Sequence, residues 1–304
     1  MKTKNFGWKN CPVCPGVFLF ERVFHFLLLT VLIAGCAERE MQNDQPLQSP
    51  NLKIGDFPQL MVDGAIITQL AKEPEIVTPT GVAVDDLNRI WVIENHTHVR
   101  QDDYVGPAVD RILVFSGYNH VGAPESITEF ATDFVDGMSL SLTQHGTVLI
   151  TTRAAIIEFT DLDGDNVADK RDTLVSLLTD EDFPHNGLSG LALGPDGKIY
   201  FQCGENFGAD YELTGSDDIS LFGKEREGGS LYRCHMDGSR VERIGTAIWN
   251  CFAMTFDDYG NLFAVENDPD SRPPCRLLHI VKGGNYGFQF QHGRDGLSPL
   301  TSWF

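Results

Sequence analysis

The sequence predicts an all-β fold, a β-propeller, and three observations support this prediction. A strand–turn–strand pattern recurs along the chain, anchored on Gly81, Ser139, Gly190 and Ala253. These anchors are 58, 51 and 63 residues apart, which leaves room for one four-stranded sheet per copy. The copies also share a polar ending, which a β-sandwich with similar hairpins would not require. We therefore expect successive copies to form successive blades of one propeller.

Each copy reads as a β-hairpin. In the third copy, the apolar stretches 191–193 and 199–201 flank a Gly-Pro-Asp-Gly turn. The first copy runs over 81–95, the fourth over 253–267, and a looser second copy ends at Arg153. At this spacing the stretch 57–304 holds four to five blades. We interpret it as an incomplete propeller domain that is truncated at its C-terminus.

The N-terminal region is typical of an exported lipoprotein. In residues 1–35, basic side chains precede an apolar run that is shorter than the roughly 20 residues that span a bilayer. The run ends in Leu-Ile-Ala-Gly-Cys36, which resembles the lipobox of bacterial lipoproteins; an ordinary secretory signal is the alternative. Residues 36–56 form a polar tether. The sequence thus predicts a lipid-anchored protein of the cell envelope, facing the periplasm or the exterior.

Composition limits the partners that the domain can bind. A hydrophobic content of 42% allows a large core, and a formal net charge of −20 disfavours nucleic-acid binding. Metal cations and neutral sugars remain compatible with such a charge. The sequence leaves open whether the four cysteines beyond the leader form disulfides or are free buried thiols. These cysteines are Cys203, Cys234, Cys251 and Cys275.

An acidic segment after the second hairpin has the spacing of a calcium loop. Oxygen donors stand at positions 1, 3, 5, 9 and 12 of a twelve-residue stretch. They are Asp161, Asp163, Asp165, Asp169 and Asp172. The sequence predicts a structural Ca²⁺ site here, and a metal-free acidic turn between strands is the alternative.

The polar endings of the hairpins predict a binding site. Equivalent positions of a propeller gather on one rim of its channel, so the endings would form a ring of carboxylates and amides with one guanidinium. These endings are Glu94-Asn95, Thr152-Arg153, Glu205-Asn206 and Glu266-Asn267, with His96 and His98 beside them. The alternative is that Glu-Asn only ends a strand and starts a turn. His185, just before the third hairpin, is a candidate base because an unperturbed histidine has a pKa of ~6.5.

Three stretches resemble the soluble quinoprotein glucose and sorbosone dehydrogenases. They are 185–187 with 193–200, then 231–239, and most specifically Val-Lys-Gly-Gly-Asn-Tyr-Gly at 281–287. Within that family the chain is most similar to the membrane-bound dehydrogenase domain of planctomycete-type bacteria. The resemblance implies a six-bladed propeller that oxidises a sugar or alcohol with pyrroloquinoline quinone and Ca²⁺, and that passes electrons to an acceptor such as a cytochrome.

The resemblance also implies roles for particular residues. His185 matches the proton-abstracting histidine, Asn250 matches an amide beside the quinone, and Asp268-Pro269 matches the Gly-Pro loop of the catalytic calcium. Two departures weaken quinone binding: Trp249 replaces a cofactor-binding arginine, and Asp268 replaces the loop glycine.

The first functional hypothesis is therefore a lipid-anchored sugar or alcohol dehydrogenase with His185 as its base. Glu94, Arg153, Glu205, Glu266 and Asn250 would surround the cofactor. Two alternatives stay open: a metal-dependent lactonase-like hydrolase, and a non-catalytic propeller that binds a glycan or a protein.

Overall fold

The computed structural model describes residues 64, 67–119, 122–223, 228–267 and 275–288. The chain divides into two compact units, residues 1–65 and 66–304, and every described strand lies in the second unit. The predicted signal, Cys36, the whole predicted tether and residues 57–63 of the predicted domain lie outside the described residues. In the described part, no helix is both long and apolar enough to cross a membrane.

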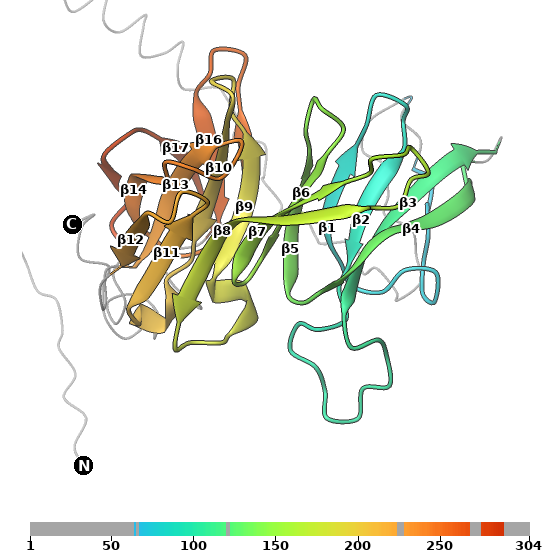
Figure 1. Cartoon of the computed structure of the whole chain (residues 1–304), viewed down its shortest axis with the longest axis horizontal. Coiled ribbons are helices and arrows are strands. Elements are labelled where there is room, and N and C mark those ends of the chain that lie inside the picture. Colours follow the sequence, from blue (N-terminus) through green and yellow to red (C-terminus); the bar gives the residue numbers. More distant parts are fainter. Residues whose placement is uncertain (1–63, 65–66, 120–121, 224–227, 268–274, 289–304) are drawn as a thin grey trace, which may run out of the picture. The chain divides into compact units, whose positions relative to one another are not determined.

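Four sheets follow one another along the chain, and we number them as blades (Figure 1). All their strand pairs are antiparallel except β14 with β18, which are parallel. The first blade contains β1 (Pro79–Val84), β2 (Ile90–Glu94), β3 (Asp110–Tyr118) and β4 (Pro124–Phe134). The second contains β5 (Gly137–Leu142), β6 (Val148–Thr152), β7 (Ala155–Thr160) and β8 (Lys170–Thr179). The third contains β9 (Leu188–Leu193), β10 (Lys198–Cys203), β13 (Gly229–His235), β14 (Glu242–Ile248) and β18 (Gly284–Asn285). The fourth contains β15 (Cys251–Phe256), β16 (Leu262–Glu266) and β17 (Arg276–Ile280).

The four predicted hairpins are the inner two strands of the four blades. In each hairpin the pairing register shifts once near the start of the first strand, so one residue bulges out of the ladder. The anchors of the sequence repeat lie at or next to these bulges. Gly190 shows why a small residue is needed there, because a Cβ on it would lie 2.3 Å from the Cys251 carbonyl oxygen of the next blade.

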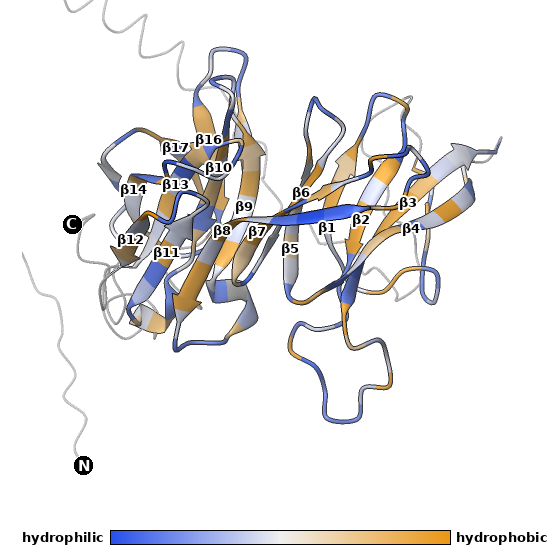
Figure 2. Cartoon of the chain, in the orientation of Figure 1, coloured by the Kyte–Doolittle hydropathy of each residue, from blue (hydrophilic) through white to orange (hydrophobic). Residues whose placement is uncertain are grey.

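The blades pack face to face in chain order, as in a propeller. The inner strand of each blade contacts that of the next, from β1 to β5, β5 to β9 and β9 to β15. One buried apolar cluster fills each of the three junctions, represented by Phe130 between the first two blades, Phe201 between the next two and Leu231 between the last two. Hydrophobic residues accordingly concentrate on the strands and hydrophilic ones on the turns (Figure 2). The predicted β-propeller is confirmed over the sandwich, with four blades in the described part.

An inserted hairpin explains the uneven spacing of the repeats. Strands β11 (Tyr211–Gly215) and β12 (Ser220–Gly223) come from the connection between β10 and β13 of the third blade. They pair instead with β8 and extend the second blade to six strands. The Tyr211 and Tyr232 hydroxyls, 2.6 Å apart in the core, tie this hairpin to the third blade.

The four cysteines beyond the leader are free rather than disulfide-bonded, which confirms the free-thiol alternative, although only three of the four are buried as expected. Cys203, Cys234 and Cys251 are buried and Cys275 is exposed. Burial raises the pKa of both Cys203 and Cys234 to about 12. These thiols therefore stay protonated and act as small apolar side chains.

Candidate functional site

The strand ends at the predicted rim are set by the hairpin register. Four residues occupy equivalent last positions, each paired with the first residue of the hairpin: Glu94, Thr152, Cys203 and Glu266. Glu205-Asn206 therefore lies two residues beyond the position that the sequence repeat assigned to it. Gly204, which follows Cys203, donates its N–H to the Gly187 carbonyl at 2.8 Å, and Asn95, Arg153 and Asn267 make the same bond in the other three hairpins. The hydrogen-bond register therefore repeats in all four blades, and only the Glu-Asn pair of the third blade is displaced.

Glu94 and Glu266 make the same contacts in the first and fourth blades. Oε1 of each accepts the backbone N–H of the residue 17 positions earlier, Val77 at 2.9 Å and Trp249 respectively. The other oxygen of each pairs with an arginine directly opposite on the third strand, Arg111 or Arg276. Each carboxylate thus ties together three segments of its own blade, so both of its oxygens already have partners.

The two glutamates differ in their pKa although their partners match. Burial is the largest influence on both. It raises the pKa of Glu266, whereas at Glu94 hydrogen bonds from Arg111, His96 and Val77 outweigh burial and the net shift is downward. The first blade therefore holds a firmly ionised carboxylate, and the fourth holds one that burial makes easier to protonate.

Arg153, the predicted guanidinium of the ring, links the second blade to the third. Its Nε donates to the Phe183 carbonyl at 3.1 Å and its Nη2 to Asn206 Oδ1 at 3.2 Å. Burial lowers the pKa of Arg153, and nearby Cys203 and Asp136 act in the opposite direction. The acidic groups around it make this cation unsuited to a free role as an anion receptor.

Asn186, Glu205 and Asn250 form a buried relay that contains two of the predicted site residues. Asn186 Nδ2 donates to Glu205 Oε1 at 2.9 Å, and Asn250 Nδ2 donates to Asn186 Oδ1 at 2.8 Å. The three residues are 1%, 2% and 0% exposed. A carboxylate can only accept, so Glu205 fixes the Asn186 amide, which in turn fixes that of Asn250.

The relay ends in an acceptor without a partner. Asn250 Oδ1 is buried and has no hydrogen-bond partner among the described residues. It lies beside Gly204, where an added Cβ would be 2.1 Å from this oxygen. Because the amide cannot flip without breaking the relay, a group placed there must donate a hydrogen bond. Asn186 was missed by sequence reasoning, although it directly follows His185 in the His-Asn-Gly stretch.

His185 and the Asp268-Pro269 pair cannot be placed in this site by their side chains. His185 belongs to a short 3₁₀ turn, η1 (Pro184–Asn186), but its side chain lies outside the described part. Asp268 and Pro269 also fall outside the described residues. The role of each remains a proposal.

The acidic loop brings together three of its five predicted ligands. Carboxylate oxygens of Asp161, Asp163 and Asp169 lie within 4.8 Å of one another. Asp165 instead accepts the Val167 N–H at 2.8 Å, and Asp172 lies on β8, 2.5 Å from Lys170 Nζ. Hydrogen bonds from backbone N–H groups, first that of Gly164, lower the pKa of Asp161. A cation here would thus meet three carboxylates rather than five.

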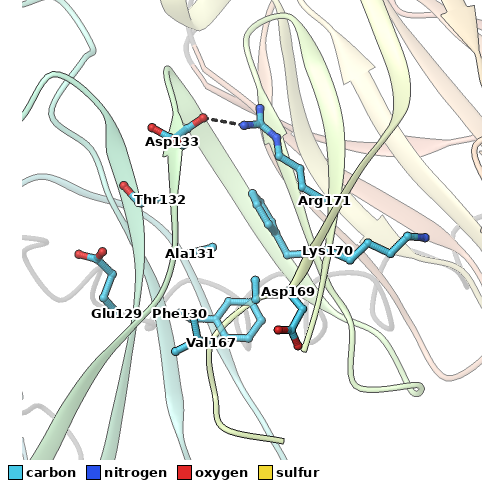
Figure 3. A pocket seen from close by; sticks show the side chains of 11 residues that line it. Glu129, Phe130, Ala131, Thr132, Asp133, Val167, Asp169, Lys170 and Arg171 are labelled. Carbon is cyan, nitrogen blue, oxygen red and sulfur yellow. Dashed lines mark hydrogen bonds between the residues drawn. The ribbon is translucent and has the colours of Figure 1, made fainter. Parts of the chain in front are cut away.

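A groove of about 300 Å³ borders this loop between β4 and the β7–β8 turn. Figure 3 shows Arg171 reaching across it toward Asp133, whose carbonyl oxygen accepts its Nη1–H at 2.6 Å. Asp169 and Val167 line the groove together with Phe130. The Ala168 N–H donates to the Phe130 carbonyl at 2.8 Å, so the loop is fastened to the first blade.

The described residues do not fit a polycarboxylated quinone. Such a cofactor needs cations for its carboxylates, but Arg111 and Arg276 already pair with glutamates. Trp249 is 4% exposed, and its ring lies 5.0 Å from that of Phe288 in an edge-on contact. An indole therefore packs into the aromatic core next to Asn250, where the resemblance would place an arginine.

Comparisons with known proteins agree on the fold. A family model described as a domain of unknown function (DUF7133) matches residues 60–282. No curated protein matches the chain. A Trichoderma reesei structure of carbohydrate-active enzyme family AA12 is similar at a TM-score of 0.50 and 15% identity, over 73% of this chain and 57% of that one.

Two further solved structures are similar at lower scores. The PQQ-bound aldose sugar dehydrogenase of Streptomyces coelicolor gives a TM-score of 0.48 at 17% identity, over 70% of this chain and 62% of that one. The PQQ domain of pyranose dehydrogenase from Coprinopsis cinerea gives 0.44 at 14% identity, over 67% and 48%. The chain thus spans about half to three fifths of the length of these propellers.

Proposed function

The chain belongs to the DUF7133 family, and we propose that its propeller binds a neutral sugar or polyol and acts as a sugar dehydrogenase with His185 as the base. The observation that carries this proposal is the ordered relay that leaves Asn250 Oδ1 as a buried acceptor without a partner in the described part of the chain. A hydroxyl group of a neutral sugar supplies the hydrogen bond that this oxygen lacks.

Charge narrows the class of ligand. Glu205 lies within the relay, and the chain carries a formal net charge of −20. The negative charge of the protein would repel a carboxylate or phosphate ligand. The oxygens of such a ligand would also be hydrogen-bond acceptors facing Asn250 Oδ1, which is itself an acceptor. A neutral polyhydroxylated ligand avoids both penalties. The Trichoderma reesei propeller, described as a carbohydrate-active enzyme, is a further reason to test sugars first.

His185 is the proposed base because of its place in the chain. It directly precedes Asn186, whose amide is held on both sides by Glu205 and Asn250. A histidine beside a bound sugar hydroxyl accepts the proton of that hydroxyl near neutral pH, where an unperturbed imidazole titrates. The resemblance to the membrane-bound dehydrogenase domain of planctomycete-type bacteria supports the same assignment.

Binding is tested first, by thermal unfolding of the full chain with and without neutral sugars and their acid derivatives. We expect neutral sugars to raise the unfolding temperature and the acids to have no effect. Asn250→Ala should abolish the shift. Asn95→Ala is the matched control, because Asn95 is also buried but its amide donates to the Gly137 carbonyl of the second blade and accepts the Thr97 N–H. Equal sugar responses of the two variants would overturn the proposal.

Oxidation is tested separately, by sugar-dependent reduction of a redox dye with and without added pyrroloquinoline quinone and Ca²⁺. His185→Gln should lose turnover while keeping the sugar-induced stabilisation. If the quinone has no effect on either dye reduction or stability, the domain binds sugar without acting as a quinoprotein. Metal-dependent lactone hydrolysis would instead support the hydrolase alternative.

Membrane anchoring through Cys36 is part of the same proposal. Lipid on this thiol would hold the domain at the envelope, facing the periplasm or the exterior. Metabolic labelling with a radioactive fatty acid should mark the expressed chain, and Cys36→Ser should remove both the label and its partition into detergent.

A further inference from the structure

Three side chains of the first blade form a row outside the amide relay. His96 Nε2 lies 2.9 Å from Glu94 Oε2, and His96 Nδ1 lies 2.5 Å from the Tyr104 hydroxyl oxygen. Glu94 ends β2, His96 follows two residues later, and Tyr104 belongs to the connection between β2 and β3. The row therefore joins a rigid strand end to a surface loop.

The ionised carboxylate fixes the direction of each hydrogen bond. Glu94 also accepts from Arg111 and from the Val77 N–H, which keeps it in the charged, acceptor-only form. A neutral His96 then carries its hydrogen on Nε2 and presents the lone pair of Nδ1 to Tyr104. The tyrosine hydroxyl consequently donates its proton toward a base that a third group orients.

Exposure increases along the row toward the tyrosine. Glu94 is fully buried, His96 is 7% exposed and Tyr104 is 39% exposed. The Arg100 guanidinium lies 5.5 Å from the centre of the Tyr104 ring, so a positive charge faces the ring on which negative charge would develop. A reagent from solvent can thus meet the tyrosine while its base stays sheltered.

We propose that Tyr104 is the nucleophile of a second site that reacts with small carboxylic esters, with His96 as general base and Glu94 as the positioning residue. The Tyr104 oxygen forms a bond to the ester carbonyl carbon as its proton passes to His96 Nδ1. The bond from that carbon to the leaving alkoxide breaks, and the alcohol departs with the proton. Water then attacks the tyrosyl ester, gives a proton to His96, and restores the Tyr104 hydroxyl as the acid leaves.

This site is independent of the proposed sugar site. It uses none of Asn186, Glu205, Asn250 or His185. Failure of sugar binding would leave it untouched, and the reverse also holds.

The experiment measures covalent labelling of the full chain by diisopropyl fluorophosphate, with the adduct located by mass spectrometry. The tyrosine oxygen bonds to phosphorus, fluoride leaves, and His96 takes the proton, so labelling reports the nucleophile without turnover. Tyr259 is the internal reference, because it is 91% exposed and the hydrogen bond that it makes in the described part is from its backbone N–H to Asp257. We expect Tyr104 to be labelled at least about 100-fold faster, within the range that a positioned base contributes.

Two variants distinguish activation of Tyr104 by His96 from simple exposure of Tyr104 to solvent. His96→Gln should reduce the labelling of Tyr104 to the rate of Tyr259. Gly106→Ala should do the same with Glu94 and His96 in place, because its Cβ would lie 2.1 Å from the Tyr104 hydroxyl oxygen and displace that flexible side chain. If His96→Gln does not fold, Gly106→Ala decides alone.

The proposal also predicts that p-nitrophenyl acetate hydrolysis is lost in Tyr104→Phe. Labelling of Tyr104 no faster than that of Tyr259, or unchanged in Gly106→Ala, would overturn the proposal. The row would then serve only to hold the β2–β3 connection against the blade.

Discussion

Arg111 on β3, opposite the end of β2, pairs with two carboxylates in different surroundings. Arg111 forms ion pairs with Glu94, whose side chain is 1% exposed, and with Glu129, whose side chain is 47% exposed. The distance from Arg111 Nη1 to Glu129 Oε2 is 3.1 Å. Because Glu94→Gln removes the buried charge that accepts hydrogen bonds from Arg111 and from the Val77 N–H, we expect it to lower the free energy of unfolding by about 2 kcal/mol. Glu129→Gln is the matched control and should cost less than about 1 kcal/mol. Urea unfolding at pH 7 measures both.

The same pair predicts a pH dependence. Burial raises the pKa of Glu94, but hydrogen bonds from Arg111, His96 and Val77 bring it below its ordinary value of 4.5. A carboxylate with a lowered pKa stabilises the fold above its unfolded pKa, and this contribution is lost as the pH falls through the folded pKa. The difference between wild type and Glu94→Gln should therefore be widest above pH 4.5 and narrow below it. A difference that grows on acidification would contradict the assignment.

Among the elements, the acidic loop after β7 gives the clearest prediction. Asp161, Asp163 and Asp169 converge, whereas Asp172 lies on β8 beside Lys170. Ca²⁺ at 100 times its dissociation constant should raise the free energy of unfolding by about 2.7 kcal/mol, because it binds only the folded loop. EDTA should reverse the effect, and thermal unfolding with each addition measures it.

Two variants of this loop test which carboxylates bind the ion. Asp161→Asn should abolish the calcium response, and Asp172→Asn, outside the converging cluster, should keep it. A calcium response that survives Asp161→Asn would place the ion elsewhere.

The elements also show where sequence reasoning succeeds and where it stops. The hairpins were predictable because apolar strands and Gly-bearing turns are local signals, and Gly190 and its counterparts fall at equivalent bulges. The alignment of Glu205 with Glu94 was wrong because the hydrogen-bond register repeats in all four hairpins whereas the Glu-Asn pair does not; the third hairpin ends at Cys203, two residues before Glu205. Equivalent positions are thus set by the pairing of the strands, and a similar residue pair close to a strand end does not identify them.

Side chains that meet across the fold were harder to predict than strands. Asn186 and Asn250 are 64 residues apart in sequence, and their contact exists only because the third and fourth blades pack together. The insertion of β11 and β12 into the second blade likewise follows from β8 presenting a free edge, which no local pattern reveals.

For the whole molecule, two blade faces in the described part have no neighbouring blade. On the fourth blade, Val265 and Leu277 are paired across β16 and β17 and are 50% and 70% exposed, opposite the face that packs on the third blade. On the first blade, Val82 and Val84 are 66% and 60% exposed beside an apolar groove of about 400 Å³. Exposed apolar faces of this kind promote association.

We therefore expect the 304-residue chain to self-associate through these faces as its concentration rises. The double variant Val265→Glu, Leu277→Lys should sediment as a monomer over the same range in analytical ultracentrifugation. Its free energy of unfolding should stay within about 0.5 kcal/mol of wild type, since exposed positions tolerate substitution. Tyr259→Lys, in the turn of the same blade, is the control that changes charge without touching the face and should leave association intact. The double variant could instead lower the free energy of unfolding by about 2 kcal/mol or more, as substitutions of buried residues do. In that case another part of the chain covers this face, and the apolar surface belongs to the core rather than to an interface between copies.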